Sequence, residues 1–155
     1  VEQFDKIPFR GISAYLTGVL STAFTYKLPR FTIEIDNEKL IETEAFTVLI
    51  TSTGQLGYNV EFTNYSELND GKFEITIVKN FNRTRVPAII YDALYGNIAN
   101  ADFLETYQVN NCLKIKANKI ESIQMDGDYK GKTNYLEVTC KKEALSFLVD
   151  KDFEL

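Results

Sequence analysis

The chain has 155 residues, a formal net charge of −5 and no histidine. The acidic balance argues against nucleic-acid binding, which needs a basic stripe facing the phosphates. The lack of histidine excludes a Ser-His-Asp triad and a histidine-rich zinc site within this chain. With 45% hydrophobic and 25% charged residues, we expect residues 1–155 to form a single globular domain.

The N-terminal segment predicts a helix. Apolar side chains recur at spacings of three and four between residues 9 and 23, and Pro8 stands where a helix can begin. We expect this stripe to pack in the core rather than on a membrane surface. The apolar stretch 12–24 is too short to span a bilayer, and no signal peptide precedes it. Because the chain begins at Val1 rather than Met, we expect it to belong to a longer protein.

From residue 30 onwards the apolar pattern changes to a period of two, which is typical of half-buried strands. Asp36 and Asn37 predict a hairpin turn between the first two strands. Together the strands predict a mainly β fold, a β-sandwich or a partly closed barrel with one N-terminal and one internal helix. We count seven to nine strands, which include the segments 30–36, 45–53, 72–80, 113–118, 122–126, 135–141 and 145–149.

The internal helix is predicted over residues 84–97. Thr84 is the predicted N-cap, Pro87 lies in the first turn and Gly96 is a natural stop. Its buried stripe would comprise Ile89, Ile90, Ala93 and Leu94.

Cysteine usage indicates a reducing compartment. Cys112 and Cys140 are far apart and lie in separate strand-like segments, so nothing indicates a secreted disulfide framework. We therefore expect a cytoplasmic protein.

The stretch Asp126-Gly127-Asp128 admits two interpretations. Glycine supplies a positive φ and aspartate bonds its own backbone, so a simple tight turn explains it. Two carboxylates on a stiff turn can also divide catalytic labour. One accepts a proton from a hydroxyl group, while the other binds a metal or orients the first. A glycosidase is poorly supported, because acids separated by one residue are badly placed to flank a sugar.

In order and spacing, several segments resemble the C-terminal domain of the diacylglycerol kinase-like family of lipid kinases. The segments are PRFTIEIDNEKL, AFTVLITSTGQLG, SELNDGKFEITIVKN, RVPAIIYDALYGN and IQMDGDYKGKTNYLEVTC. The family pattern reads Asp-Gly-Glu where this chain has Asp126-Gly127-Asp128. The side chain of Asp128 is therefore shorter by ~1.5 Å, one carbon–carbon bond.

The resemblance implies a two-domain enzyme that moves the γ-phosphoryl group of ATP to a lipid hydroxyl with Mg²⁺. Asp128 would be the proton acceptor, and Asp126 its neighbour near Mg²⁺ or the phosphates. A structural Mg²⁺ would take the carboxylate of Asp70 and main-chain oxygens of Glu67 and Lys72, since oxygen ligands suit this ion. ATP would be held mainly by the protein's own N-terminal domain, so this chain alone would be inactive.

The implied partners are a lipid substrate and, transiently, a membrane surface, with the protein peripheral at the inner membrane. The sequence leaves both a monomer and a homodimer open. A different class of function also fits the residues, namely a β-sandwich that binds a ligand or a protein without catalysis. The 9 Tyr and 11 Phe favour such a module, because aromatic side chains supply contact surface as well as core.

Overall fold

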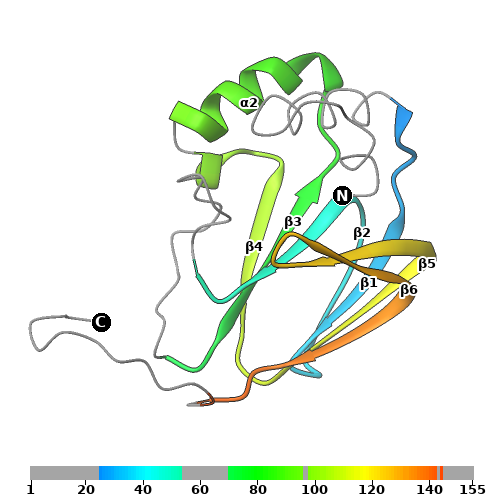
Figure 1. Cartoon of the computed structure of the whole chain (residues 1–155), viewed down its shortest axis with the longest axis vertical. Coiled ribbons are helices and arrows are strands. Elements are labelled where there is room, and N and C mark those ends of the chain that lie inside the picture. The colour runs from blue at the N-terminus through cyan, green and yellow to red at the C-terminus, as the bar shows by residue number, and fades with distance from the viewer. Residues whose placement is uncertain (1–24, 54–69, 96–97, 143, 145–155) are drawn as a thin grey trace, which may run out of the picture.

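A computed structural model of the chain describes residues 25–53, 70–95, 98–142 and 144. Its main feature is one six-stranded sheet, in the order β4-β3-β2-β1-β5-β6, that curls into a partly closed barrel (Figure 1). The prediction of a mainly β fold with a partly closed barrel is therefore confirmed. The strands are β1 (Arg30–Ile35), β2 (Lys39–Thr51), β3 (Phe73–Lys79), β4 (Leu104–Val109), β5 (Cys112–Met125) and β6 (Asp128–Thr139).

Every neighbouring pair of strands is antiparallel. The hairpin between β1 and β2 turns at Asp36 and Asn37, whose φ angles are 54° and 59°. The Glu38 amide closes the turn by donating to the Ile35 carbonyl at 3.0 Å. Two consecutive positive φ angles characterise the turn whose twist matches that of the flanking strands, and Asp and Asn tolerate them. The predicted turn is confirmed.

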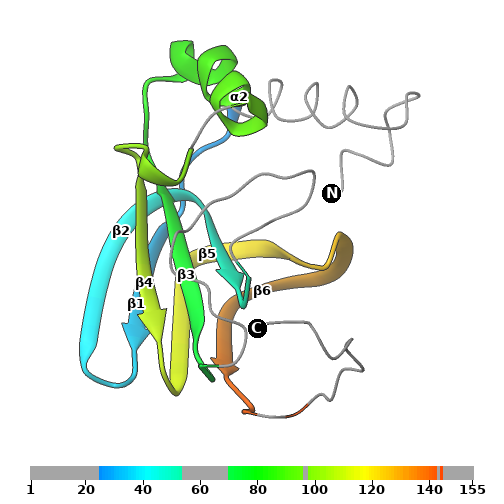
Figure 2. The same ribbon diagram turned by 90° about the vertical axis from the view of Figure 1, so that its left-hand side faces the viewer.

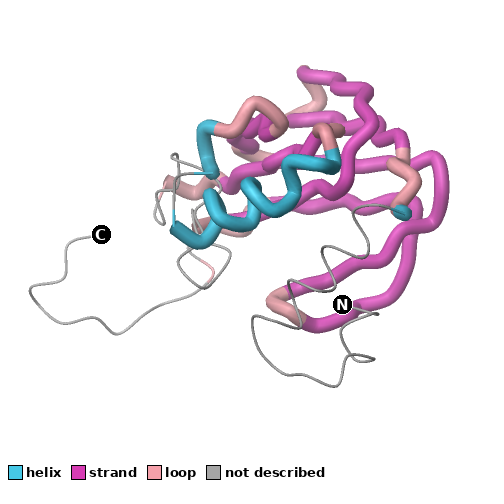
Figure 3. Tube along the Cα trace, turned by 90° about the horizontal axis from the view of Figure 1, so that it is seen from above, coloured by secondary structure: helices cyan, strands magenta, loops and turns pink. Residues whose placement is uncertain are grey.

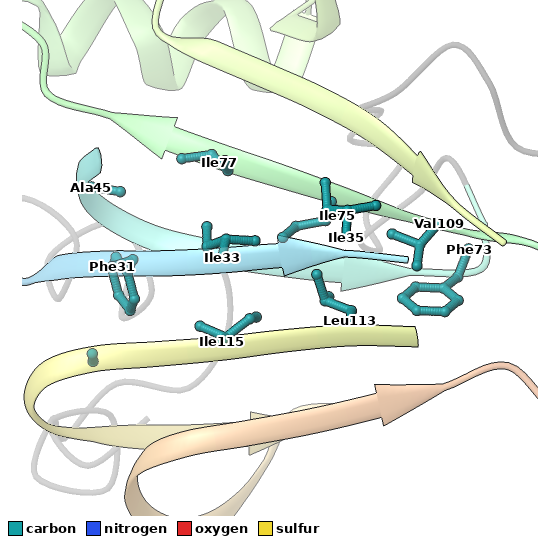
Figure 4. Packing of buried hydrophobic residues seen from close by; sticks show 11 residues of the cluster. Phe31, Ile33, Ile35, Ala45, Phe73, Ile75, Ile77, Val109, Leu113 and Ile115 are labelled. Carbon is teal, nitrogen blue, oxygen red and sulfur yellow. The ribbon is translucent and has the colours of Figure 1, made fainter. Parts of the chain in front are cut away.

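The core lies inside the curl of the sheet. Ile33 of β1, Ile75 and Ile77 of β3 and Leu113 of β5 have no exposed surface. Figure 4 shows these side chains between the strands, with Phe31 and Ile115 towards one end and Phe73 towards the other. Alternate residues of each strand point inward, so the period of two in the sequence places the isoleucines on this face. This face holds the strands in register.

A bulge in β2 contributes a side chain to a second apolar cluster. The pairing of β2 with β3 shifts between Ala45 and Thr47, so Phe46 is an extra residue. Its ring centroid lies 4.6 Å from that of Phe81, which in turn lies 4.9 Å from that of Phe103. Tilted contacts of this kind stabilise aromatic clusters.

The internal helix begins differently from the prediction. A 3-10 turn, η2 (Arg83–Arg85), precedes α2 (Val86–Tyr95), and the Asn82 side chain accepts from the Thr84 amide at 3.1 Å. Asn82 rather than Thr84 is therefore the capping residue, because the helical segment begins with the 3-10 turn at Arg83, before Thr84. Pro87 lies in the first turn of α2, as predicted, and Ile89 and Ile90 are partly buried. Figure 3 shows α2 crossing above one end of the sheet.

Other strand predictions need correction. The segments 113–118 and 122–126 are parts of the single long strand β5, and β4 was not predicted at all. The strands within the described ranges number six. The predicted N-terminal helix, the predicted last strand 145–149 and Gly96 lie outside the described residues. A further 3-10 turn, η3 (Ile98–Asn100), precedes β4.

Cys112 and Cys140 are both free thiols. Cys112 precedes the inward-facing Leu113 and lies on the outer face, whereas Cys140 packs against the core. In the part of the chain that the structure describes, no helix is long and apolar enough to cross a membrane.

Candidate functional site

Asp126 and Gly127 form the two-residue turn that joins β5 to β6. Their φ angles are 50° and 90°, and Met125 pairs directly with Asp128. The space around Gly127 is open, so its positive φ rather than crowding is the reason for a glycine here. The turn interpretation of this stretch is confirmed, and the two acids lie at the tip of a long hairpin.

This hairpin bends out of the sheet. β1 pairs with β5 only as far as Ala117. In the pairing of β5 with β6, Lys116 pairs with Tyr135 but Glu121 pairs with Thr133, so five steps along β5 correspond to two along β6. The extra residues turn the outer part of the hairpin away from the sheet, as Figure 2 shows. We call residues 121–133 the distal hairpin.

A second irregularity lies close to the tip. Gln124 pairs with Tyr129 but Ile123 pairs with Gly131, so Lys130 is an extra residue in β6. Gly131 has a φ of 113°, which a larger residue adopts with difficulty. The Lys130 ammonium lies 3.2 Å from the Asp128 carboxylate, and the Asp128 side chain is 77% exposed. The tip thus presents a carboxylate to solvent with a lysine at its side.

The root of the distal hairpin is held by residues 26–30. The Tyr26 hydroxyl donates to the Glu121 carboxylate at 2.7 Å. The Lys119 ammonium donates to the Lys27 carbonyl at 2.8 Å, and the Arg30 amide donates to the Asn118 side-chain oxygen at 3.0 Å. Burial and the neighbouring Glu121 carboxylate raise the pKa of Tyr26 above its usual value, so its phenol remains a donor at neutral pH.

Asp70 lies in a separate turn, just before β3. Its carboxylate accepts from the Lys72 amide at 2.8 Å, which is a local turn closed by a side chain. Gly71 has a φ of 69°, and a Cβ at this position would meet the Lys142 side chain at 2.7 Å. The Asp70 side chain is 16% exposed. Figures 1 and 2 show the start of β3 and the tip of the distal hairpin in different parts of the molecule, so the predicted metal and catalytic residues are not brought together.

A second carboxylate lies near Asp70. Glu74 is 2% exposed, on the face of β3 that points away from the core. Burial and the negative charge of Asp70 raise the pKa of Glu74, against the effect of a hydrogen bond from Gln108. Repulsion between two carboxylates is of the kind that a hard divalent cation relieves. Glu67 lies outside the described residues, and no group of three or more His, Cys, Asp or Glu residues within the described ranges could hold a metal.

The structure also forms an open groove that the sequence analysis missed. It has a volume of about 520 Å³ and lies where β2, β3, η2 and β4 meet. Arg85 is paired with Asp102 at 3.2 Å, so the charges of the groove are largely balanced. No local signal identifies it, because its residues come from three separate segments. They are Glu44, Lys79, Asn80, Phe81, Asn82, Arg85, Asp102 and Phe103.

Residues 2–149 match the family model described as the YegS C-terminal NAD kinase beta sandwich-like domain. A diacylglycerol kinase of Bacillus subtilis is 30% identical over 99 residues, which are 64% of this chain and 32% of that protein. This chain therefore aligns with about a third of that relative.

Solved structures share the fold. A diacylglycerol kinase from Bacillus anthracis superposes with a TM-score of 0.54 at 19% identity, over 81% of this chain and 43% of that one. A second crystal structure from the same organism gives a TM-score of 0.62 at 19% identity, over 84% of this chain and 42% of the other. In both cases the chain corresponds to less than half of the longer protein.

Proposed function

Because the chain belongs to the family of YegS C-terminal NAD kinase beta sandwich-like domains, we propose that it is the C-terminal domain of a lipid kinase. The enzyme would transfer the γ-phosphoryl group of ATP to the hydroxyl group of a diacylglycerol-like or sphingoid lipid. The observation that carries this proposal is the similarity to a protein named diacylglycerol kinase over 99 residues. Since those residues are 32% of that protein, the missing nucleotide-binding part would be the protein's own N-terminal domain.

The distal hairpin supplies the proton acceptor in this proposal. Asp128 would take the proton of the lipid hydroxyl, which requires an approach to about 3 Å. Its 77% exposed side chain at the end of a projecting hairpin supports such an approach by a separate domain. Asp126 would face the metal or the phosphates. Bound ATP and Mg²⁺ would supply the phosphoryl group and neutralise its charge, because phosphoryl transfer depends mostly on positioning and electrostatics.

Asp70 would have a separate, structural task. Its carboxylate would hold a divalent ion at the start of β3, far from the acids of the turn. We take this ion to be Mg²⁺, with the main-chain oxygens of Glu67 and Lys72 as further ligands. The enzyme would work in the cytoplasm and meet its lipid at the surface of the inner membrane.

A phosphoryl-transfer assay tests the proposal. The full-length protein would be incubated with labelled ATP, Mg²⁺ and vesicles containing diacylglycerol, a sphingoid base or phosphatidylglycerol. Asp128→Asn is compared with Asp92→Asn, a matched change at an exposed aspartate of α2. We expect transfer to one lipid, lost by a factor of about 100 or more in Asp128→Asn and kept in Asp92→Asn.

The alternative is a binding module without catalysis. In that case Asp128, whose only close charged partner among the described residues is Lys130, would be a turn residue without a catalytic task. No transfer to any lipid, or transfer that Asp128→Asn leaves unchanged, would support this module and contradict the kinase proposal.

A further inference from the structure

The direction of the distal hairpin depends on its root. Pairing of β5 with β1 ends at Ala117, and β6 is hydrogen-bonded to β5 alone in the described sheet. Beyond the bend, the ladder between the two strands therefore cannot fix the angle between the hairpin and the sheet. Contacts at the root therefore help to set this angle.

One of these contacts reaches past the bend. Two hydrogen bonds hold the bend itself. Asn118 accepts from the Arg30 amide, and Lys119 donates to the Lys27 carbonyl. In the part of the chain that the structure describes, the bond from Tyr26, at 2.7 Å, holds Glu121, a residue that is again paired with β6. Glu121 is thus the first fixed point of the distal hairpin.

The other end of this bond is also fixed. The Arg83 guanidinium donates to the Tyr26 carbonyl at 2.9 Å. The Lys119 ammonium lies 4.8 Å from the centre of the Tyr26 ring and 3.2 Å from the Glu121 carboxylate. Tyr26 therefore links η2, through its carbonyl, to the hairpin, through its phenol, in a chain of charged and polar contacts.

We propose that Tyr26 and Glu121 are positioning residues, whose hydrogen bond sets the angle of the distal hairpin and thereby the location of Asp128. This inference rests on the proposed function, since it matters only if Asp128 has a task. Met125 lies four residues beyond Glu121, roughly 13 Å along a strand at about 3.3 Å per residue. A change of about 5° at the root would therefore move the tip by about 1 Å. A displacement of about 1 Å can cost a hundredfold in rate.

The test uses Tyr26→Phe in the full-length protein, which removes the donor and keeps the ring. The matched control is Tyr135→Phe. The Tyr135 hydroxyl also donates to a glutamate, Glu137, at 3.1 Å, but on the part of β6 that is still next to the sheet. We expect kcat for lipid phosphorylation to fall about tenfold in Tyr26→Phe with KM for ATP unchanged. The control should change less than twofold.

Changes at Glu121 make the assignment specific. Glu121→Gln keeps an oxygen that accepts from Tyr26 and should retain kcat within about threefold, whereas Glu121→Ala should match Tyr26→Phe. Combining Tyr26→Phe with Glu121→Ala should cost no more than either change alone, because both remove one interaction.

Three results would overturn the inference, and they are distinguishable from one another. If Asp128→Asn abolishes transfer while Tyr26→Phe keeps kcat within twofold, or if Tyr135→Phe lowers kcat equally, the bond does not position the acid. If Asp128→Asn also has no effect, the proposed function itself fails and the positioning role fails with it.

Discussion

Asp36 and Cys112 are joined by two hydrogen bonds that run in opposite directions. The Asp36 amide donates to the Cys112 carbonyl at 2.8 Å, and the Cys112 amide donates to the Asp36 carboxylate at 3.0 Å. The same carboxylate accepts from the amides of Asn110, at 2.9 Å, and Asn111, at 2.7 Å. One side chain thus closes the turn between β4 and β5 against the turn between β1 and β2.

We expect Asp36→Asn to lower the free energy of unfolding by about 1 kcal/mol, because it removes the charge from these hydrogen bonds. Asp36→Ala should cost about 2 kcal/mol or more, since alanine also tolerates the φ of 54° poorly. Urea unfolding measures both. Asp92→Ala, on the exposed side of α2, is the control and should lie within about 0.5 kcal/mol of the wild type. An equal loss in the control would contradict a specific role for Asp36.

The Asp36 contacts also predict a pH dependence. Burial acts to raise the pKa of Asp36, but the hydrogen bonds from Asn110, Cys112 and Asn111 outweigh it and hold the pKa below its usual value. The stabilisation is therefore fully present above about pH 3.9, the value of an unfolded aspartate, and is lost as the pH falls through the folded-state pKa. The difference in unfolding free energy between wild type and Asp36→Asn should shrink in acid. A difference that stays constant to about pH 2 would contradict this.

Tyr107 should ionise unusually late. Burial and the hydrogen bond to Glu105 raise the pKa of its phenol to about 12. The folded state is therefore stabilised below about pH 10, and this contribution is lost as the pH rises through 12. Carbon-13 NMR of the tyrosine rings measures the titration, and Tyr107→Phe assigns the signal. Glu105→Gln should move the pKa of Tyr107 back towards about 10, and an unchanged value would contradict the role of the charge.

Asp126→Asn distinguishes the role of Asp126 in the turn from its proposed role in phosphoryl transfer. Asparagine is favoured before glycine in a turn of this type, so stability should change by less than about 0.5 kcal/mol. If Asp126 faces the metal or the phosphates, transfer by the full-length protein should nevertheless fall about tenfold or more. Unchanged transfer, beside a loss in Asp128→Asn, would leave Asp126 as a turn residue only.

The core isoleucines should dominate stability. Ile33 has no exposed surface and is surrounded by β3 and β5 side chains, so Ile33→Ala should cost about 3–4 kcal/mol. Leu40 is 64% exposed on the neighbouring strand, and Leu40→Ala should cost less than about 0.5 kcal/mol. Urea unfolding compares the two, and similar costs would show that the curl of the sheet does not enclose the main core.

The sequence predicted those parts of the fold that depend on neighbouring residues alone, namely strands and turns. The alternation in β1 and β3 follows from side-chain period, and the turns at residues 36–37 and 126–127 follow from residues that accept positive φ. β4 was missed because only Val109 of its six residues is fully buried, so its apolar alternation is weak. Asn82 was overlooked as a cap because a 3-10 turn precedes α2.

The candidate site was less predictable. The turn at Asp126 was recognised, but its lift from the sheet depends on Tyr26, which is 95 residues away from Glu121 in the sequence. Residues 119–121 interrupt the alternation of β5 and resemble a break between the predicted segments 113–118 and 122–126. In the folded chain β5 runs through this point, where Asn118 and Lys119 bond to Arg30 and Lys27. Long-range contacts of this kind leave no periodic signal in one sequence.

The outer edge of β6 carries a further consequence. The Thr133 hydroxyl donates to the Tyr135 carbonyl at 2.9 Å and accepts from the Tyr135 amide at 3.2 Å. Among the described strands β6 lies at the edge of the sheet, and an edge strand invites another chain to add a strand. Here the extra Lys130 breaks the row of backbone groups, while Thr133 engages the next ones. The strand that carries the candidate acid can therefore stay open to a substrate without becoming a template for aggregation.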